Sequence, residues 1–271
     1  MDATTAALMT RVLDALDGYQ QLGNEVFEAA GAVFCRNRAY PRRHDANYVT
    51  HVTASTPAEI DALLARVEAE YAGFSHRRID TDFRTAPTVA ARLVVDGWKP
   101  GDGLCLLLEG ELKLTSKPAD CEIRLVESEE DWRQRTTLML QDWAEDSAKN
   151  GSAFDGTLGE PFTSALRAKT PHARHWMAYV DGAPAAFFSS WPGTDGVGQV
   201  EDLFTHPAYR KRGIAVALIA HCVADARARG AREVAITADP NDTPKQLYAA
   251  MGFRPLMTLR AFNRSLEPKT A

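Results

Sequence analysis

The sequence predicts an α/β fold built from two related halves in tandem. Segments with the alternating pattern of a strand and segments with the three- and four-residue spacing of a helix follow one another along the chain. One order of elements occurs twice, at residues 89–108 and 244–262: a helix, then Gly, an aromatic residue, a basic residue and Pro, then an apolar strand. The 271 residues are enough for two domains of ordinary size.

The first half opens with an amphipathic helix. Apolar residues recur at helical spacing over residues 8–16, and Gly18 is expected to end this helix. A second helix is expected to begin at Thr56, because Thr followed by Pro57 and Glu59 is a favourable helix start. The other elements expected in this half are strands over 47–54, 76–83 and 103–114, a helix over 85–97 and an irregular segment over 31–46.

A linker is expected at residues 115–120, TSKPAD, where all periodicity is lost and Pro, Ser, Lys and Asp gather. We place a domain boundary near Pro118 within this linker. The predicted domains are therefore residues 1–118 and residues 119–271.

The second half has clear signals for the start of a helix and for a hairpin. Ser128 precedes a helix whose first turn is acidic, and Asp181-Gly182 joins two strands as a hairpin turn. The expected strands are 121–128, 175–180, 184–191, 197–206, 233–239 and 256–262, and the expected helices are 129–146, 162–169, 214–229 and 243–251, with a loop over 150–159.

The composition excludes several classes of protein. A 45% apolar and 25% charged share is typical of a soluble globular chain, and a net charge of -5 argues against wrapping nucleic acid or an anionic membrane surface. The four cysteines form no CxxC pair, so we expect neither a metal site nor a disulfide framework. No run approaches the roughly 20 apolar residues of a membrane span, and the acidic N-terminus lacks the pattern of a signal peptide. We expect a cytoplasmic protein with reduced thiols.

A basic cluster stands directly before a helical segment in the stretch HPAYRKRGIAVAL, where Arg210, Lys211 and Arg212 run into Gly213. Such a cluster can serve nucleic acid, a solvated turn or a phosphate cradle. A helix N-terminus after a strand presents unpaired N–H groups and a favourable dipole, and Gly213 and Ala215 leave room for a ligand there. The pattern favours a phosphate site, although the Walker GxxxxGK[ST] and Rossmann GxGxxG sequences are both missing.

The stretch resembles a motif of the GNAT acetyltransferases, [RQ]-x-x-G-x-[GA], which stands between a strand and a helix. Arg210, Gly213 and Ala215 match it. Asn241 and residues 247–253 are similar to the N-x-x-A-x-x-L-Y-x-x-x-G-F signature of the family's last helix, although Pro244 replaces the usual Ala.

The resemblance covers residues 120–265 well and residues 45–115 in outline. It implies a GNAT-like mixed, mostly antiparallel sheet flanked by helices. No glycine lies between the predicted strand 47–54 and the helix that starts at Thr56, so the first half is expected to be a degenerate GNAT-like repeat that serves structure or acceptor binding.

By the same resemblance, acetyl-CoA is the expected co-substrate. Backbone amides of the motif would hold its pyrophosphate, and the N–H groups of Leu203 and Thr205 would bind the thioester oxygen and the pantetheine. The residues expected to bind the coenzyme are Leu203, Phe204, Thr205, Arg210, Lys211, Arg212, Gly213, Ile214, Ala215 and Asn241.

Two neighbouring carboxylates are candidates for the general base. In a regular strand Glu201, Leu203 and Thr205 share one face, and Asp202 and Phe204 share the other. The resemblance favours Glu201, which would act through water, and Asp202 is the rival because a bulge before the motif would exchange the faces. Either carboxylate could instead form a structural salt bridge.

Tyr248 is the candidate general acid, since the resemblance puts its phenol beside the coenzyme sulfur. The phenol's ordinary pKa near 10 suits donation to a thiolate. The alternative is that Tyr248 is a core residue at helical spacing. Asn241 would bind the pantetheine arm or cap the last helix.

The predicted activity is transfer of an acetyl group from acetyl-CoA to a primary amine of a small molecule. The alternative is a non-catalytic acyl-CoA-binding sensor or scaffold module. Nucleic-acid binding through the basic run is disfavoured by the acidic net charge. No nucleic-acid or membrane partner is expected, and the sequence leaves the acceptor and the oligomeric state open.

Overall fold

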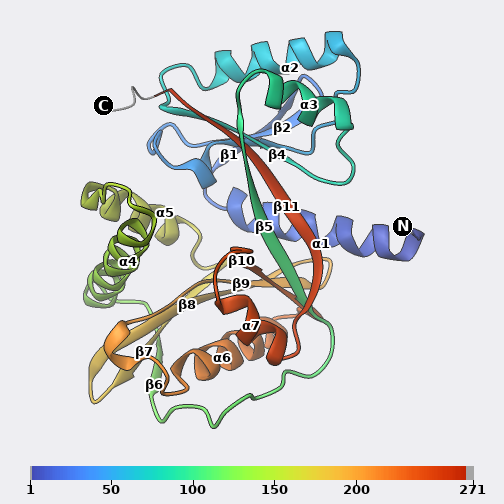
Figure 1. Cartoon of the computed structure of the whole chain (residues 1–271). Coiled ribbons are helices and arrows are strands. Elements are labelled where there is room, and N and C mark those ends of the chain that lie inside the picture. Colours follow the sequence, from blue (N-terminus) through green and yellow to red (C-terminus); the bar gives the residue numbers. More distant parts are fainter. Residues whose placement is uncertain (1, 267–271) are drawn as a thin grey trace. The chain divides into compact units, whose positions relative to one another are not determined.

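A computed structural model describes residues 2–266 of the chain (Figure 1). The chain divides into two compact units, and each is assembled from separate segments. Unit 1 contains residues 2–22, 106–238 and 242–256, and unit 2 contains residues 23–105, 239–241 and 257–266. The first helix, α1 (Ala3–Gln21), thus belongs to the unit that holds most of the second half of the sequence. The domain boundary near Pro118 stays a prediction.

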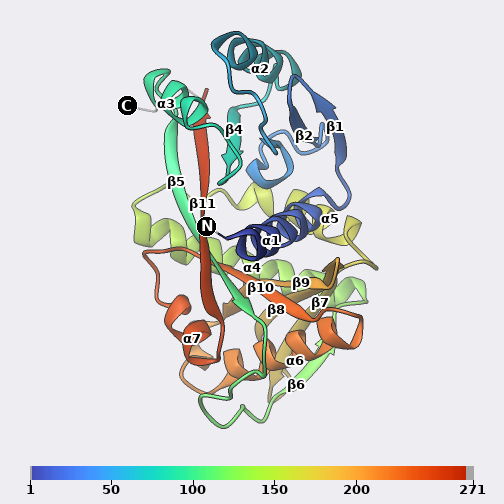
Figure 2. The same cartoon turned by 90° about the vertical axis from the view of Figure 1, so that its right-hand side faces the viewer.

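Unit 1 contains a sheet with helices on both faces. Its strands are neighbours in the order β10-β9-β8-β7-β6, and they pair antiparallel except for the parallel pair β9 and β10. Helices α1, α4 and α5 lie on one face and α6 on the other (Figures 1 and 2). The bounds are β6 Glu122–Leu125, α4 Glu129–Asn150, α5 Gly159–Ala168, β7 Arg174–Val180, β8 Ala183–Thr194, β9 Val197–Thr205, α6 Ile214–Ala228, β10 Glu233–Ala238 and α7 Pro244–Ala250.

Unit 2 has its own apolar core. Leu63 of α2 and Leu93 of α3 pack with Phe34, Val49 and Ile79 of the strands, and all five are fully buried. The strand order is β1-β2-β3-β4-β11, with β3 and β4 parallel and the other pairs antiparallel. The bounds are β1 Glu25–Ala29, β2 Ala32–Arg36, β3 Tyr48–Thr50, α2 Pro57–Glu70, β4 His76–Thr81, α3 Pro87–Val95, β5 Lys99–Leu108 and β11 Arg254–Ser265.

The same run of elements occurs twice. The run consists of a strand, a helix, a parallel strand, a second helix and a long strand. It forms β3-α2-β4-α3-β5 in one case and β9-α6-β10-α7-β11 in the other. Residues of β5 and of β11 fall in both units. The predicted fold class is confirmed: a mixed, mostly antiparallel α/β arrangement with helices flanking the sheet.

The repeated sequence pattern forms the same turn twice. After α3, Trp98 N–H donates to the carbonyl of Leu93 at 2.9 Å, and after α7, Phe253 N–H donates to that of Tyr248 at 3.0 Å. The glycine before each aromatic residue has φ of +82° at residue 97 and +101° at residue 252, which a glycine adopts readily. Tyr248 therefore occupies in unit 1 the place that Leu93 has in unit 2.

The predicted helix starts and the hairpin are confirmed. Thr56 and Ser128 each form a capping box with the residue three positions later, Glu59 and Asp131. Asp181 and Gly182 have φ of +50° and +76° between β7 and β8, as a tight hairpin turn requires.

Two predictions about the N-terminal region are wrong. The first helix continues past Gly18 to Gln21, because a Cβ at Gly18 would lie 2.8 Å from the Trp191 ring and the glycine instead lets α1 pack closely on β8. The segment predicted as irregular contains β2, which pairs with β1 through the turn at Ala30 and Gly31. In the part of the chain that the structure describes, no helix has the length and apolar character needed to cross a membrane.

Candidate functional site

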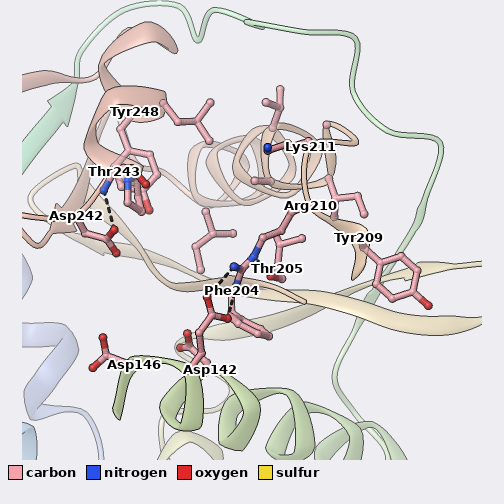
Figure 3. A pocket seen from close by; sticks show the side chains of 18 of the residues that line it. Asp142, Asp146, Phe204, Thr205, Tyr209, Arg210, Lys211, Asp242, Thr243 and Tyr248 are labelled. Carbon is pink, nitrogen blue, oxygen red and sulfur yellow. Dashed lines mark hydrogen bonds and ion pairs between the residues drawn. The ribbon is translucent and has the colours of Figure 1, made fainter. Parts of the chain in front are cut away.

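A cavity of about 800 Å³ opens in unit 1 among α4, the end of β9, the start of α6 and α7 (Figure 3). It collects most of the residues that the sequence singled out for coenzyme binding, together with Tyr248. The predicted residues that line it are Leu203, Phe204, Thr205, Arg210, Lys211, Gly213, Ile214, Ala215 and Tyr248.

The N-terminus of α6 presents a row of backbone donors at this cavity. Within residues 2–266, the N–H groups of residues 211–216 donate to no protein acceptor, whereas Ala217 N–H already bonds the carbonyl of Gly213 at 3.1 Å. No side chain caps this helix, and its N-cap, Gly213, has φ of +78°. Open amides and the positive end of the helix dipole together make a site for an anion.

The equivalent helix of unit 2 has its N-terminus filled by its own carboxylate. Glu59 accepts hydrogen bonds from the N–H groups of Ser55 and Thr56 at 2.9 and 3.0 Å, and Thr56 Oγ1 accepts from Glu59 N–H at 3.3 Å. These bonds lower the pKa of Glu59 to about 2, so the carboxylate stays charged and occupies the place of an external anion. This difference agrees with the missing glycine there.

Gly213 is required by a close approach of the chain as well as by its φ. A Cβ at this position would lie 2.7 Å from the carbonyl oxygen of Lys117, in the predicted linker, and Ala119 N–H donates to the carbonyl of Gly213 at 3.4 Å. A side chain at Gly213 would therefore displace the linker and strain the backbone.

The three basic residues of the motif have different surroundings. Arg210 Nη1 and Nη2 bond the Glu145 carboxylate of α4 at 2.7 and 2.6 Å, and Arg210 Nε donates to the carbonyl of Thr205 at 2.9 Å. Arg212 lies over the ring of Tyr209 at 5.6 Å and does not line the cavity. Lys211 is exposed and lines the cavity at the start of α6.

A bulge in β9 corrects the predicted strand faces. Phe187 of β8 pairs with Phe204, but Ser189 pairs with Glu201, so β9 has one extra residue in this interval. Asp202 takes φ of +64° at the bulge. Glu201 and Phe204 therefore pair with two residues that share one face of β8. Their side chains lie on the same face of the sheet, whereas a regular strand would place them on different faces.

Glu201 lies in a partly buried position with neutral hydrogen-bond donors. Thr237 Oγ1 of β10 donates to Oε1 at 3.0 Å, and the Gln199 side-chain amide also donates to the carboxylate. Burial, and then the charge of Asp202, raise the pKa of Glu201 to about 7. Glu201 can therefore exchange a proton near neutral pH.

Asp202 lies in a charged environment. Its Oδ2 is 3.4 Å from Arg135 Nη2 of α4 and 3.4 Å from the Tyr19 hydroxyl of α1. Arg135 is 1% exposed, which makes Asp202 the partner of a buried cation. No local pattern in the sequence indicates Arg135 or Tyr19 at this site, because their positions follow from how α4 and α1 pack on the sheet.

Tyr248 lies in the cavity wall and is 5% exposed. Burial, and then the charge of Glu201, raise the pKa of its phenol, so it stays protonated at neutral pH. Leu93, which takes the equivalent position in unit 2, carries no donor.

Asn241 lies in the loop before α7 and is assigned to unit 2, where its N–H donates to the Asp239 carboxylate at 2.7 Å. Its predicted role in binding the coenzyme stays a prediction. Among residues 2–266, no group of three or more His, Cys, Asp or Glu side chains is arranged to hold a metal ion.

An acidic face of α4, not singled out from the sequence, lines the cavity opposite Lys211 and Tyr248 (Figure 3). It consists of Asp142, Glu145 and Asp146. Burial, and then the charges of Asp146 and Glu145, raise the pKa of Asp142 to about 6. The spacing of these residues by three and four was a helical signal that could have identified the face.

Comparison with known proteins agrees with this geometry. Residues 126–253, which run from just before α4 to just after α7, match the family model of the Acetyltransferase (GNAT) family, and they include most of the residues that line the cavity. A search of curated proteins finds no match.

Several solved structures share the fold at low sequence identity. A functionally unknown conserved protein from Staphylococcus epidermidis superposes with a TM-score of 0.67 and 14% identity, covering 90% of this chain and 95% of that one. A GCN5-related N-acetyltransferase from Kribbella flavida gives 0.64 and 16%, covering 98% and 96%. A tandem GNAT protein from the clavulanic acid biosynthesis pathway gives 0.57 and 15%, covering 82% and 76%.

Proposed function

We propose that the protein transfers an acetyl group from acetyl-CoA to a primary amine of a small molecule, a function that the match of residues 126–253 to the Acetyltransferase (GNAT) family model supports. The observation that carries this proposal is the open row of backbone donors at residues 211–216, at the edge of a cavity that also contains a protonated phenol and an acidic wall. Each part corresponds to one requirement of the reaction.

The diphosphate of the coenzyme would bind the amides of residues 211–216. These amides need an acceptor, and the helix dipole favours a negatively charged one. Lys211 would add charge at the rim, while Arg210 would hold the loop in place through Glu145. Asn241 and Arg212 would contribute at the periphery.

The thioester would lie beside the bulge of β9. Within the described residues, the parallel register of β9 with β10 ends at Val200 and Ile236, although β9 continues to Thr205. Leu203, Phe204 and Thr205 line the cavity in this interval. N–H groups of Leu203 and Thr205 would bind the carbonyl oxygen, which becomes more negative in the transition state.

Glu201 would act as the general base and Tyr248 as the general acid. The amine nitrogen attacks the carbonyl carbon, a C–N bond forms and the C–S bond breaks. The ammonium first gives one proton to Glu201 through a water molecule, so that the nitrogen is neutral when it attacks. The departing thiolate receives a proton from Tyr248, and the second proton that the nitrogen loses as the amide forms restores the phenol. A carboxylate whose pKa lies near 7 accepts a proton at neutral pH better than an ordinary one does.

The acceptor would be a cation in solution. An amine carries a positive charge at neutral pH, since its ordinary pKa is about 10. Asp142 and Asp146 in the cavity wall supply the complementary charge. They would concentrate the ammonium form near the base.

A measurement of free CoA distinguishes this proposal from a non-catalytic acyl-CoA sensor. The purified protein is incubated with acetyl-CoA and a panel of polyamines, aminoglycosides, amino acids and peptides, and the released thiol is quantified. Calorimetry measures binding of acetyl-CoA in parallel. We expect binding and thiol release with at least one amine. Binding without release across the whole panel would favour the sensor, and no binding would reject both.

A further inference from the structure

Asp202 and Glu201 are adjacent carboxyl groups, yet their surroundings differ in one decisive respect. Asp202 faces a buried cation, and Glu201 accepts hydrogen bonds from neutral donors. The bulge of β9 brings both toward the face of the sheet that α1 and α4 cover, since Tyr19 and Arg135 reach Asp202 there.

Arg135 needs a negative partner. Its guanidinium is 1% exposed, lies 4.7 Å from the centre of the Phe187 ring and has its Nε without a hydrogen-bond partner. Among residues 2–266, Asp202 is the one carboxylate that forms an ion pair with it. A buried cation without a counter-ion is strongly destabilising, so Asp202 is the counter-ion that Arg135 requires.

The neighbouring polar groups strengthen this assignment. His175 Nε2 lies 3.1 Å from the carbonyl of Leu166, which only accepts, so Nε2 holds the proton and Nδ1 accepts from Ser189 at 2.9 Å. Burial lowers the pKa of His175, which stays neutral. Ser189 Oγ also lies 3.4 Å from Asp202 Oδ2, but its one proton is engaged with His175, so Arg135 and Tyr19 are the donors left to hold the Asp202 carboxylate.

We propose that Arg135 is a positioning residue: its ion pair holds the Asp202 carboxylate beside Glu201, so that Glu201, which has neutral donors, is the carboxyl group that exchanges a proton during turnover. The inference rests on the proposed acetyl transfer for its catalytic part only. Tyr19 supplies the second donor to Asp202, which makes the N-terminal helix α1 part of the catalytic unit.

Charged and titratable groups from several elements lie near Glu201 or its neighbour Asp202. Burial is the largest cause of the raised pKa of Glu201, the charge of Asp202 adds to it, and Lys169 after α5 opposes it. Tyr19 and Tyr248 are phenols whose pKa is raised, so both are neutral and change no charge near pH 7. The groups are Tyr19 from α1, Arg135 from α4, Lys169 after α5, Asp202 from β9 and Tyr248 from α7.

The test is a direct titration of Glu201 in the free protein. Glutamate is labelled with ¹³C at the carboxyl carbon, the Glu201 resonance is assigned with Glu201→Gln, and its midpoint is compared in the parent and in the double variant Arg135→Met, Asp202→Asn. The double variant removes both charges, so no buried ion is left alone. Asn also tolerates the positive φ at position 202.

We expect the Glu201 midpoint to fall by about 1 to 2 pH units in the double variant, because the like charge next to it is gone. Tyr19→Phe removes a donor without changing any charge, so the Glu201 midpoint in this variant should shift by less than about half of that amount. An unchanged or raised midpoint in the double variant, or an equal shift in Tyr19→Phe, would overturn the inference.

The pH profile of CoA release separates this inference from the proposed function. If the protein acetylates an amine, the acidic limb of its profile should move to lower pH together with the ¹³C midpoint. If it releases no CoA, acetyl transfer fails while the titration still decides whether the Arg135–Asp202 pair acts on Glu201. If it releases CoA with the same acidic limb in the double variant, the role of the Arg135–Asp202 pair fails and acetyl transfer stands.

Discussion

The guanidinium of Arg210 forms two hydrogen bonds with the carboxylate of Glu145, at 2.7 and 2.6 Å. This pair ties the loop before α6 to α4, and the Nε bond to the Thr205 carbonyl ties it to β9. Arg210 matches the first position of the family's phosphate motif, yet its side chain holds protein groups. Its contribution to coenzyme binding is therefore to shape the loop that carries the open amides.

Removing the Glu145 carboxylate should show that Arg210 contributes to acetyl-CoA binding by holding the loop before α6 in place. Glu145→Gln breaks a pair whose members are 42% and 33% exposed, so the loss of stability should stay within about 1 kcal/mol. We expect acetyl-CoA affinity to fall about two- to fivefold as the loop loosens. Calorimetry at two salt concentrations checks this. A gain in affinity would mean that Arg210, once released, binds the diphosphate itself.

A carboxylate placed in the first turn of α6 should abolish coenzyme binding without unfolding the protein. Ala215→Glu puts a negative charge beside the open amides, where it repels a diphosphate but suits the helix dipole. Ala220→Glu, on the same helix outside the cavity lining, is the matched control. We expect at least about a hundredfold loss of affinity in the first and little change in the second, with similar melting temperatures. Equal affinities in both variants would contradict the phosphate site.

Tyr248→Phe should lower turnover more than coenzyme affinity. The substitution keeps the buried ring and removes the hydroxyl that would protonate the thiolate, so kcat should fall at least about tenfold while the Kd of acetyl-CoA changes little. Tyr179→Phe is the matched control, because the hydroxyl of Tyr179 lies away from the cavity and donates to the Gln134 side chain. Stopped-flow and calorimetric measurements provide the two constants, and parent-like turnover in Tyr248→Phe would remove it from the acid role.

The raised pKa of Glu201 should also appear in the stability of the protein. A carboxyl group whose pKa is higher in the folded state binds more protons when folded, so its contribution to stability falls as pH rises from about 4.5 to about 7. Glu201→Gln removes this penalty and should stabilise the protein by about 1 to 3 kcal/mol at pH 8, with little effect at pH 4. Denaturant unfolding at the two pH values measures it. The same difference at both values would show that ionisation of Glu201 is not the cause.

Asp142→Asn should weaken binding of the amine acceptor and leave binding of acetyl-CoA unchanged. The carboxylate lines the cavity and has its pKa raised to about 6, so it is mostly ionised at pH 7.5. Its loss should raise the KM for a cationic amine about five- to tenfold. Asp181→Asn, in the hairpin between β7 and β8, is the control. An unchanged KM for Asp142→Asn would mean that the acceptor is recognised elsewhere.

Much of the fold follows from local signals in the sequence. Thr56 and Ser128 begin helices because their side chains cap the first turn, and Asp181-Gly182 forms a hairpin because both residues adopt positive φ. The open N-terminus of α6 follows in the same way from Gly213. These features depend on few neighbouring residues, so the sequence alone indicates them.

The remaining features arise from packing between segments far apart in the sequence. The sequence predicts that the first helix ends at Gly18, but the Trp191 ring packs against this glycine and the helix continues. Arg135 lies within an ordinary polar helix, and its burial depends on where α4 meets the sheet. The sequence alone does not decide on which face of the strand Glu201 and Asp202 lie, because one extra residue in β9 reverses the alternation.

A crystal structure of the protein with CoA tests the central claim most directly. We expect the two phosphates of the diphosphate to accept hydrogen bonds from N–H groups within residues 211–216, and the sulfur to lie near the hydroxyl of Tyr248. CoA bound at another surface, or a diphosphate in solvent with those amides uncontacted, would contradict the account.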